Sequence, residues 1–163
     1  MKRIVLAALA TALLQAAWGA DASTAPGSPA ERPPDRANLS KVRSLKIILK
    51  VEGKELTATL IDGRTSRDFI ALLPLALTMN DLFGREKFGH LPRALSEEGQ
   101  RTHTYEVGDI GYWSPGGDVA IYYRQDGQKI PDPGIIVLGK IDAGVEALDV
   151  PGSVKVTVEP VSK

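Results

Sequence analysis

The feature that most constrains this fold is a succession of short strand-like runs that begins at Leu45. β-branched and aliphatic residues gather in these runs, and Gly, Pro and Asp separate them, which is typical of strands joined by turns. The runs are residues 45–51, 55–61, 75–79, 110–113, 119–124, 135–141 and 154–159. Many short strands with little helix predict a mainly β domain, a closed or nearly closed antiparallel barrel.

One or two short helices should accompany the strands. Thr65 and Asp68 fit a capping-box spacing, and the apolar residues that follow predict a helix that ends at Pro74. Residues 142–148 predict a second short helix, with the aspartate at its first position as N-cap. Residues 82–100 contain three glycines and a proline, so an irregular loop is expected there.

The N-terminus predicts export. Lys2 and Arg3 precede an almost uncharged run over residues 4–18, which as a helix would extend about 22 Å, short of a bilayer core. Ala20-Asp21-Ala22 then fits a small-x-small cleavage pattern, and Ala17-Trp18-Gly19 fits it as well. A signal peptide over residues 1–22 is therefore expected, with a periplasmic or secreted product; the alternative is a buried N-terminal helix.

The next segment, residues 23–44, is rich in Pro, Ser and charge and has too few large aliphatics to build a core. It predicts a flexible Pro-rich tether before a single domain over residues 45–160. The chain has 20 basic and 20 acidic residues and no Cys. That balance argues against a nucleic-acid or membrane partner after cleavage, and the lack of Cys excludes thiol catalysis and disulfides. A monomer is expected.

Four blocks in order resemble a known family, the small bacterial cyclophilin-like domain family. The blocks are residues 60–69 (LIDGRTSRDF) with Leu73-Pro74-Leu75, residues 84–93 (GREKFGHLPR), residues 108–117 (GDIGYWSPGG) with 120–123 (AIYY), and residues 138–144 (LGKIDAG). The resemblance implies a cyclophilin-type β-barrel capped by helices. It does not imply the isomerase, because the Phe-His-Arg-Val-Ile and Gln-Gly-Gly-Asp motifs of true cyclophilins have no match here.

The candidate site is an aromatic groove. Strand alternation places Tyr112 and Trp113 on opposite faces of one strand, and separates Tyr122 from its neighbour Tyr123 in the same way. One member of each pair should be core, and the other can face a groove. The ligand-binding candidates are Arg93, Tyr112, Trp113 and Tyr122. Aromatic bodies with polar tips suit a peptide or a small molecule. The alternative is that these rings only pack the barrel.

Three functions follow from this interpretation. The first is a binding module for a peptide or small ligand, without robust isomerase activity. The second is a peptidyl-prolyl isomerase in which Arg93 donates to the twisted amide, and the third is a structural accessory domain. No cofactor, metal site or catalytic residue is assigned, because the sequence has neither close ligand spacing nor a nucleophile elbow. Four basic residues cluster over residues 85–101, but glutamates are interspersed among them, which predicts a solvated surface of mixed charge. The basic residues are Arg85, Lys87, Arg93 and Arg101.

Overall fold

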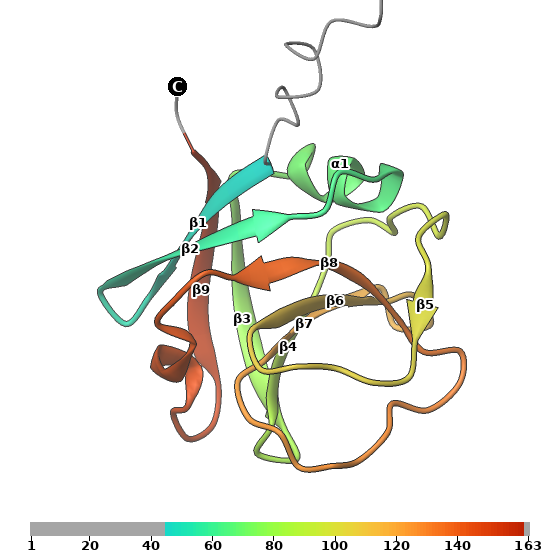
Figure 1. Cartoon of the computed structure of the whole chain (residues 1–163). Coiled ribbons are helices and arrows are strands. Elements are labelled where there is room, and N and C mark those ends of the chain that lie inside the picture. The colour runs from blue at the N-terminus through green and yellow to red at the C-terminus, as the bar shows by residue number, and fades with distance from the viewer. Residues whose placement is uncertain (1–44, 162–163) are drawn as a thin grey trace, which may run out of the picture. The chain divides into compact units, whose positions relative to one another are not determined.

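The strand-like runs fold into an antiparallel sheet that closes on itself (Figure 1). The computed structural model describes residues 45–161, so the expected signal peptide and tether lie outside the described residues. The elements are β1 (Leu45–Val51), β2 (Lys54–Leu60), α1 (Arg64–Ile70), β3 (Leu75–Leu82), β4 (Glu86–His90), β5 (Arg101–Thr102), β6 (Asp109–Trp113), β7 (Asp118–Tyr122), β8 (Ile135–Ile141), the 3-10 helix η2 (Val145–Leu148) and β9 (Val154–Pro160). None of the helical segments within this range is long and apolar enough to cross a bilayer.

Eight strands form a closed barrel, as expected from the sequence. Their order is β2-β1-β9-β3-β4-β7-β6-β8, and β8 pairs with β2 through Ala58↔Ile141 and Leu60↔Gly139 to complete the ring. The two-residue strand β5 adds to the free end of β8. Closure removes the exposed edges that an open sheet of this size would present.

The core occupies the barrel interior, where alternate residues of each strand point. Ile47, Leu49 and Val51 of β1 are all buried, while the residues between them are not. Phe69 of α1, which lies at one end of the barrel in Figure 1, and Leu148 of η2 join the same apolar cluster. Helix and barrel are therefore held by one core, in agreement with a barrel capped by helices.

A second, smaller cluster lies on the outer surface of β7 and β8. Its members, named here the outer cluster, are Tyr105, Ala120, Tyr122, Ile130 and Ile135. On β7, the interleaved residues Val119 and Ile121 belong instead to the barrel interior. The loop after β7 supplies Ile130, so the outer cluster forms where this loop folds back over the barrel wall. This cluster provides the apolar surface beside which the candidate site forms.

Two helix predictions need correction at their starts. The N-cap of α1 is Gly63, with no side-chain cap, and Asp68 instead accepts a hydrogen bond from the backbone amide of Ser96 at 3.0 Å. The second helix is shorter than predicted and begins after Gly144. The Asp142 carboxylate is engaged with Lys46 and Thr59 across the barrel seam, at 3.0 and 2.8 Å, so it is not a cap.

The segment 82–100 also contains more order than its glycines indicate. It holds β4, which pairs with β3 and β7. Gly89 lies inside that strand, and a side chain there would approach Met79 Cγ at 3.3 Å, so close packing against β3 explains this glycine. Gly84 lies in the β3–β4 turn at a φ of 66°. Both glycines therefore belong to the β3–β4 hairpin, although the sequence predicted that they mark an irregular loop.

Candidate ligand-binding pocket

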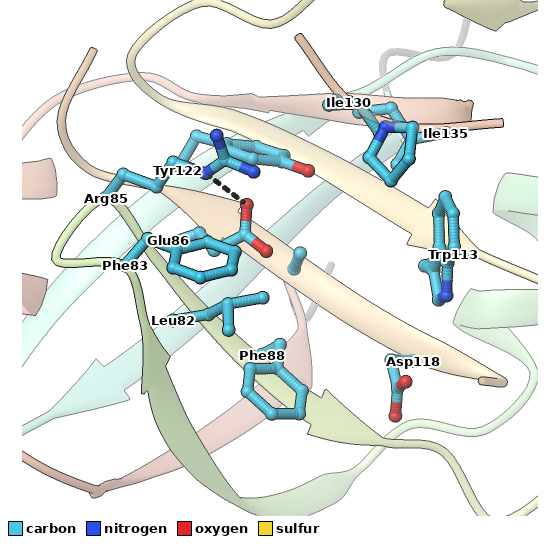
Figure 2. Close-up of a pocket in the computed structure, with 12 residues that line it drawn as sticks. Leu82, Phe83, Arg85, Glu86, Phe88, Trp113, Asp118, Tyr122, Ile130 and Ile135 are labelled. Atoms are coloured by element: carbon cyan, nitrogen blue, oxygen red, sulfur yellow. Dashed lines mark ion pairs between the residues drawn. The ribbon is translucent and has the colours of Figure 1, made fainter. Parts of the chain in front are cut away.

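A pocket of about 250 Å³ opens beside the outer cluster, over the outer faces of β4 and β7 (Figure 2). Its wall is mostly apolar: Leu82, Phe83, Phe88, Trp113, Ala120, Ile130, Pro131 and Ile135 line it together with Arg85, Glu86, Asp118 and Tyr122. The residues come from five strands of the sheet (β3, β4, β6, β7 and β8), from the β3–β4 turn and from the loop that precedes β8. A small apolar pocket with a few polar groups is the usual form of a site for a small ligand.

The β3–β4 turn places an aromatic ring at the rim of the pocket. Phe83 and Gly84 both have positive φ, 57° and 66°, in a tight turn that the Arg85 amide closes by donating to the Leu82 carbonyl at 3.2 Å. Asp81 supports the turn by accepting a hydrogen bond from the Gly84 amide at 2.9 Å. A bulky residue is rare at such a φ, and the Phe83 side chain is also 76% exposed. An exposed aromatic residue with a left-handed φ thus lies at the rim of the pocket.

Next to this ring, Arg85 and Glu86 form a buried ion pair. Arg85 Nε lies 3.4 Å from Glu86 Oε2, and only 7% of either side chain is exposed. The guanidinium lies 5.3 Å from the centre of the Phe83 ring and 5.4 Å from that of Tyr105. Its Nη1 also donates to the carboxylate of Asp126 at 3.3 Å. Two aromatic rings and two carboxylates therefore hold this guanidinium in one position.

The carboxylate of Glu86 is not fully satisfied. Oε2 is buried, and it has no hydrogen-bond partner among residues 45–161. Burial raises the pKa of Glu86, although the positive charge of Arg85 opposes that effect. Burial, and then the negative charge of Glu86, also raise the pKa of the Tyr122 phenol, which therefore remains neutral and can donate. Both polar groups face a wall that is otherwise apolar.

The aromatic floor of the pocket is rigid. Tyr122 stacks on Tyr105 with ring centres 4.2 Å apart and an angle of 22° between the planes. The hydroxyl of Tyr105 donates to Asp126 at 2.7 Å, so the carboxylate that holds Arg85 also holds this ring. Figure 2 shows the Tyr122 hydroxyl pointing from β7 toward Ile130, Ile135 and Trp113. Ring stacking and this hydrogen bond thus hold the pocket floor through contacts within the protein.

The structure divides the four residues predicted for the groove. Trp113 and Tyr122 line the pocket together. Tyr112 is fully buried in the barrel core, where its hydroxyl accepts a hydrogen bond from the Leu95 amide at 3.1 Å. Arg93 is exposed in the segment after β4 and does not line this pocket. Its charge acts on Asp68 of α1, whose pKa is lowered by the Ser96 amide and, to a smaller extent, by Arg93.

The charged residues of the β3–β4 hairpin correct another prediction. Arg85 and Lys87, expected on a solvated surface, are 5% and 0% exposed. Lys87 points into the barrel, where its ammonium donates to Asp81 at 2.8 Å and to the Gly152 carbonyl at 2.7 Å. Charge alternation along a sequence cannot show which charges find partners in the interior. Arg85 and Glu86 were missed as site residues for this reason, and Phe83 was missed because the segment 82–100 was expected to be an irregular loop.

Other sites of chemistry are not apparent within residues 45–161. Across these residues, no group of three His, Asp or Glu side chains is arranged to hold a metal ion. His90 lies near Asp118 at 3.3 Å, and His103 near Asp132 at 3.7 Å, both with largely exposed rings. These pairs lie on separate segments and do not assemble a nucleophile.

Comparison with known proteins agrees with the fold. The model of a family described as "Cyclophilin-like family" matches residues 49–159. Among solved structures, a hypothetical protein from Archaeoglobus fulgidus, determined in solution, superposes with a TM-score of 0.60 at 23% identity, covering 72% of this chain and 95% of its own. At that identity the likeness concerns the fold. No curated protein matches.

Proposed function

This chain belongs to the cyclophilin-like family, and we propose that its barrel is a binding module for a small ligand or a peptide side chain. The observation that carries the proposal is the pocket beside the outer cluster, where an apolar wall surrounds a buried and incompletely satisfied ion pair. An apolar wall supplies affinity, and the polar groups of Glu86 and Tyr122 supply orientation. Packing of a structural domain alone does not require a strained Phe83 at the rim of a cavity.

The size of the pocket limits the ligand. A volume of about 250 Å³ lies below the usual range for drug-sized ligands, so the ligand, or the part of it that enters, is a compact group such as one ring with a short chain. A molecule of that size binding through apolar contact should have a Kd of about 1 mM. A natural ligand that also satisfies the buried polar groups would bind more tightly.

Peptidyl-prolyl isomerisation is the second candidate function. It needs a donor aimed at the prolyl amide beside an apolar pocket, and the guanidinium that meets this condition is Arg85 rather than Arg93. However, Arg85 is already engaged by Glu86 and Asp126. A guanidinium neutralised by two carboxylates stabilises a twisted amide less than a free one does. The geometry therefore favours binding over catalysis.

Export is a separate part of the proposal and rests on the sequence of residues 1–22 alone. The positive start, the short apolar run and the small residues around Ala22 favour cleavage and a periplasmic or secreted product. In that setting the tether over residues 23–44 would link the barrel to the site of cleavage. The signal peptide, the tether and the pocket together favour an exported binding module.

Titration with 4-phenyl-1-butanol tests the binding function. In a Trp18→Phe background, Trp113 is the one remaining tryptophan, so its fluorescence reports on the pocket wall. We expect a saturable change, and amide chemical-shift changes confined to residues around β4, β7 and Ile130. The variant Ala120→Leu fills the pocket and should weaken binding at least tenfold.

The matched control is Ala76→Leu, the same enlargement at an exposed position of β3 that does not line the pocket. It should bind the probe as the parent does. Equal binding by Ala120→Leu, or shift changes elsewhere on the barrel, would contradict the assignment of the pocket. A protease-coupled assay with a proline peptide, comparing the parent with Arg85→Lys, tests the isomerase: a cyclophilin-like rate abolished by the substitution would reverse the preference for binding.

A further inference from the structure

The residues that line the pocket carry more negative than positive charge. Two carboxylates, those of Glu86 and Asp118, line it, and Arg85 is the one cation among the lining residues. The positive charge of Arg85 is shared with a third carboxylate, Asp126, at 3.3 Å. An anionic ligand would therefore meet net negative charge in an apolar environment, where such repulsion is poorly screened. A cation would meet attraction.

One oxygen of the buried Glu86 carboxylate faces the pocket. The side chain is more than nine-tenths buried, and its Oε2 faces Arg85, whose Nε lies 3.4 Å away. Figure 2 shows the second carboxylate oxygen pointing away from Arg85, toward the pocket. A carboxylate oxygen accepts hydrogen bonds, so the ligand group that best suits this oxygen is a donor.

The rings around the pocket favour the same kind of ligand. Phe83, Phe88, Trp113 and Tyr122 all line it. The faces of aromatic rings carry partial negative charge and attract ammonium and guanidinium groups. Arg85 already uses one of these faces, since its guanidinium lies 5.3 Å from the Phe83 ring centre. The wall therefore suits a cation that carries an apolar body.

We propose that the pocket selects a protonated primary amine attached to a compact aromatic or aliphatic group, with the ammonium donating to Glu86. This inference rests on the proposed binding function and specifies its ligand class. The ammonium is held by Glu86 at one side of the pocket, and the carboxylate of Asp118 at the other side adds to the attraction (Figure 2). The apolar body occupies the space between Phe88, Trp113 and Ile135.

Three probes that share one apolar body test the preference for an amine separately from the binding function. 4-Phenylbutylamine, 4-phenyl-1-butanol and 5-phenylvalerate share one phenylbutyl body and differ only in their head groups, which are cationic, neutral and anionic at neutral pH. By the Trp113 fluorescence titration in the Trp18→Phe chain, we expect the amine to bind at least tenfold more tightly than the alcohol, and the acid more weakly than the alcohol. If the alcohol and acid bind as well as the amine or better, the amine inference is overturned while the binding function stands. If none of the three binds, the binding function itself fails.

Substitution identifies the carboxylate responsible. Glu86→Gln keeps the shape of the side chain and should lower the affinity for the amine to that for the alcohol, with the alcohol changed less than threefold. Glu159→Gln removes the same charge from a distant carboxylate that pairs with Lys50, and should leave the amine preference unchanged.

Should Glu86→Gln fail to fold, Asp118→Asn provides an independent test, because this side chain lies at the other side of the pocket and pairs only with the exposed His90 among residues 45–161. It should reduce the amine preference at least threefold. An unchanged preference in both pocket variants would overturn the inference. A parallel titration with acetyl-Phe-Lys-amide shows whether a lysine side chain can present the ammonium, and competition with 4-phenylbutylamine would support the same site.

Discussion

Replacing Lys87 by Met should destabilise the barrel more than any other single charge removal on β4. The ammonium of Lys87 is fully buried, and it donates to Asp81 at 2.8 Å and to the backbone carbonyls of Val150 and Gly152. It thus joins β4 to the segment between η2 and β9. Asp81 also accepts from the Tyr123 hydroxyl at 2.6 Å, so the variant leaves a largely buried carboxylate with one partner fewer.

The magnitude follows from these contacts. Removing one partner of a buried ion pair costs about 3–5 kcal/mol, and the lower end applies because a quarter of the Asp81 side chain is exposed to water. The two carbonyls add about 1 kcal/mol, since their segment lies at the surface and water can reach it. A loss of about 4 kcal/mol is a large part of the stability of a domain this size, and corresponds to a melting temperature lower by about 15 °C.

Urea unfolding, followed by Trp113 fluorescence in the Trp18→Phe chain, measures this loss. Lys155→Met is the matched control, because Lys155 is an exposed residue of β9; its effect should stay within about 0.5 kcal/mol. Adding Asp81→Asn to Lys87→Met removes the uncompensated charge and should restore about 1–2 kcal/mol. A Lys87→Met variant as stable as the parent, or more stable, would refute the reasoning, since the buried pair would then contribute specificity without stability.

Three further outcomes are expected. Phe83→Asn places a residue that tolerates the left-handed conformation in the turn, so unfolding should become less favourable by about 0.5–1 kcal/mol, while the affinity for 4-phenyl-1-butanol falls; unchanged stability would show that the turn is not strained. The folded-state pKa of Glu86 is raised above 4.5, so Glu86 stabilises the fold at low pH and this contribution is lost as pH rises through the raised pKa. The difference in unfolding free energy between the parent and Glu86→Gln, measured in urea, should therefore decrease from about pH 4 to about pH 7, and an increase would contradict the assigned direction. Intact-mass analysis of the exported protein should find Ser23 at the mature N-terminus, or Ala20 if the second cleavage pattern is used; a retained Met1 in the exported fraction would reject the signal peptide.

The barrel itself was predictable from local patterns. Alternation on β6 and β7 correctly placed Tyr112 and Trp113 on opposite faces, and Tyr122 and Tyr123 likewise, with one member of each pair in the core. Such assignments succeed because side chains of a strand alternate between two faces whatever the rest of the chain does. The predicted loop over residues 82–100 was wrong where it contains β4, because a glycine in a tight hairpin and a glycine packed under a neighbouring strand look like loop residues in a sequence.

The candidate site depended on tertiary structure to a much greater degree. Arg93, as a guanidinium donor, and Tyr112, as one of the paired strand aromatics, were candidates for the groove. The closed barrel leaves Arg93 exposed and places Tyr112 in the core. The pocket instead combines Phe83 and Glu86 with Ile130, which are far apart in the chain. Local sequence decides which face of a strand a side chain occupies. Whether a charge on that face is solvated, or is buried beside an unfilled apolar space, depends on which distant segment covers it, and only the folded chain determines that.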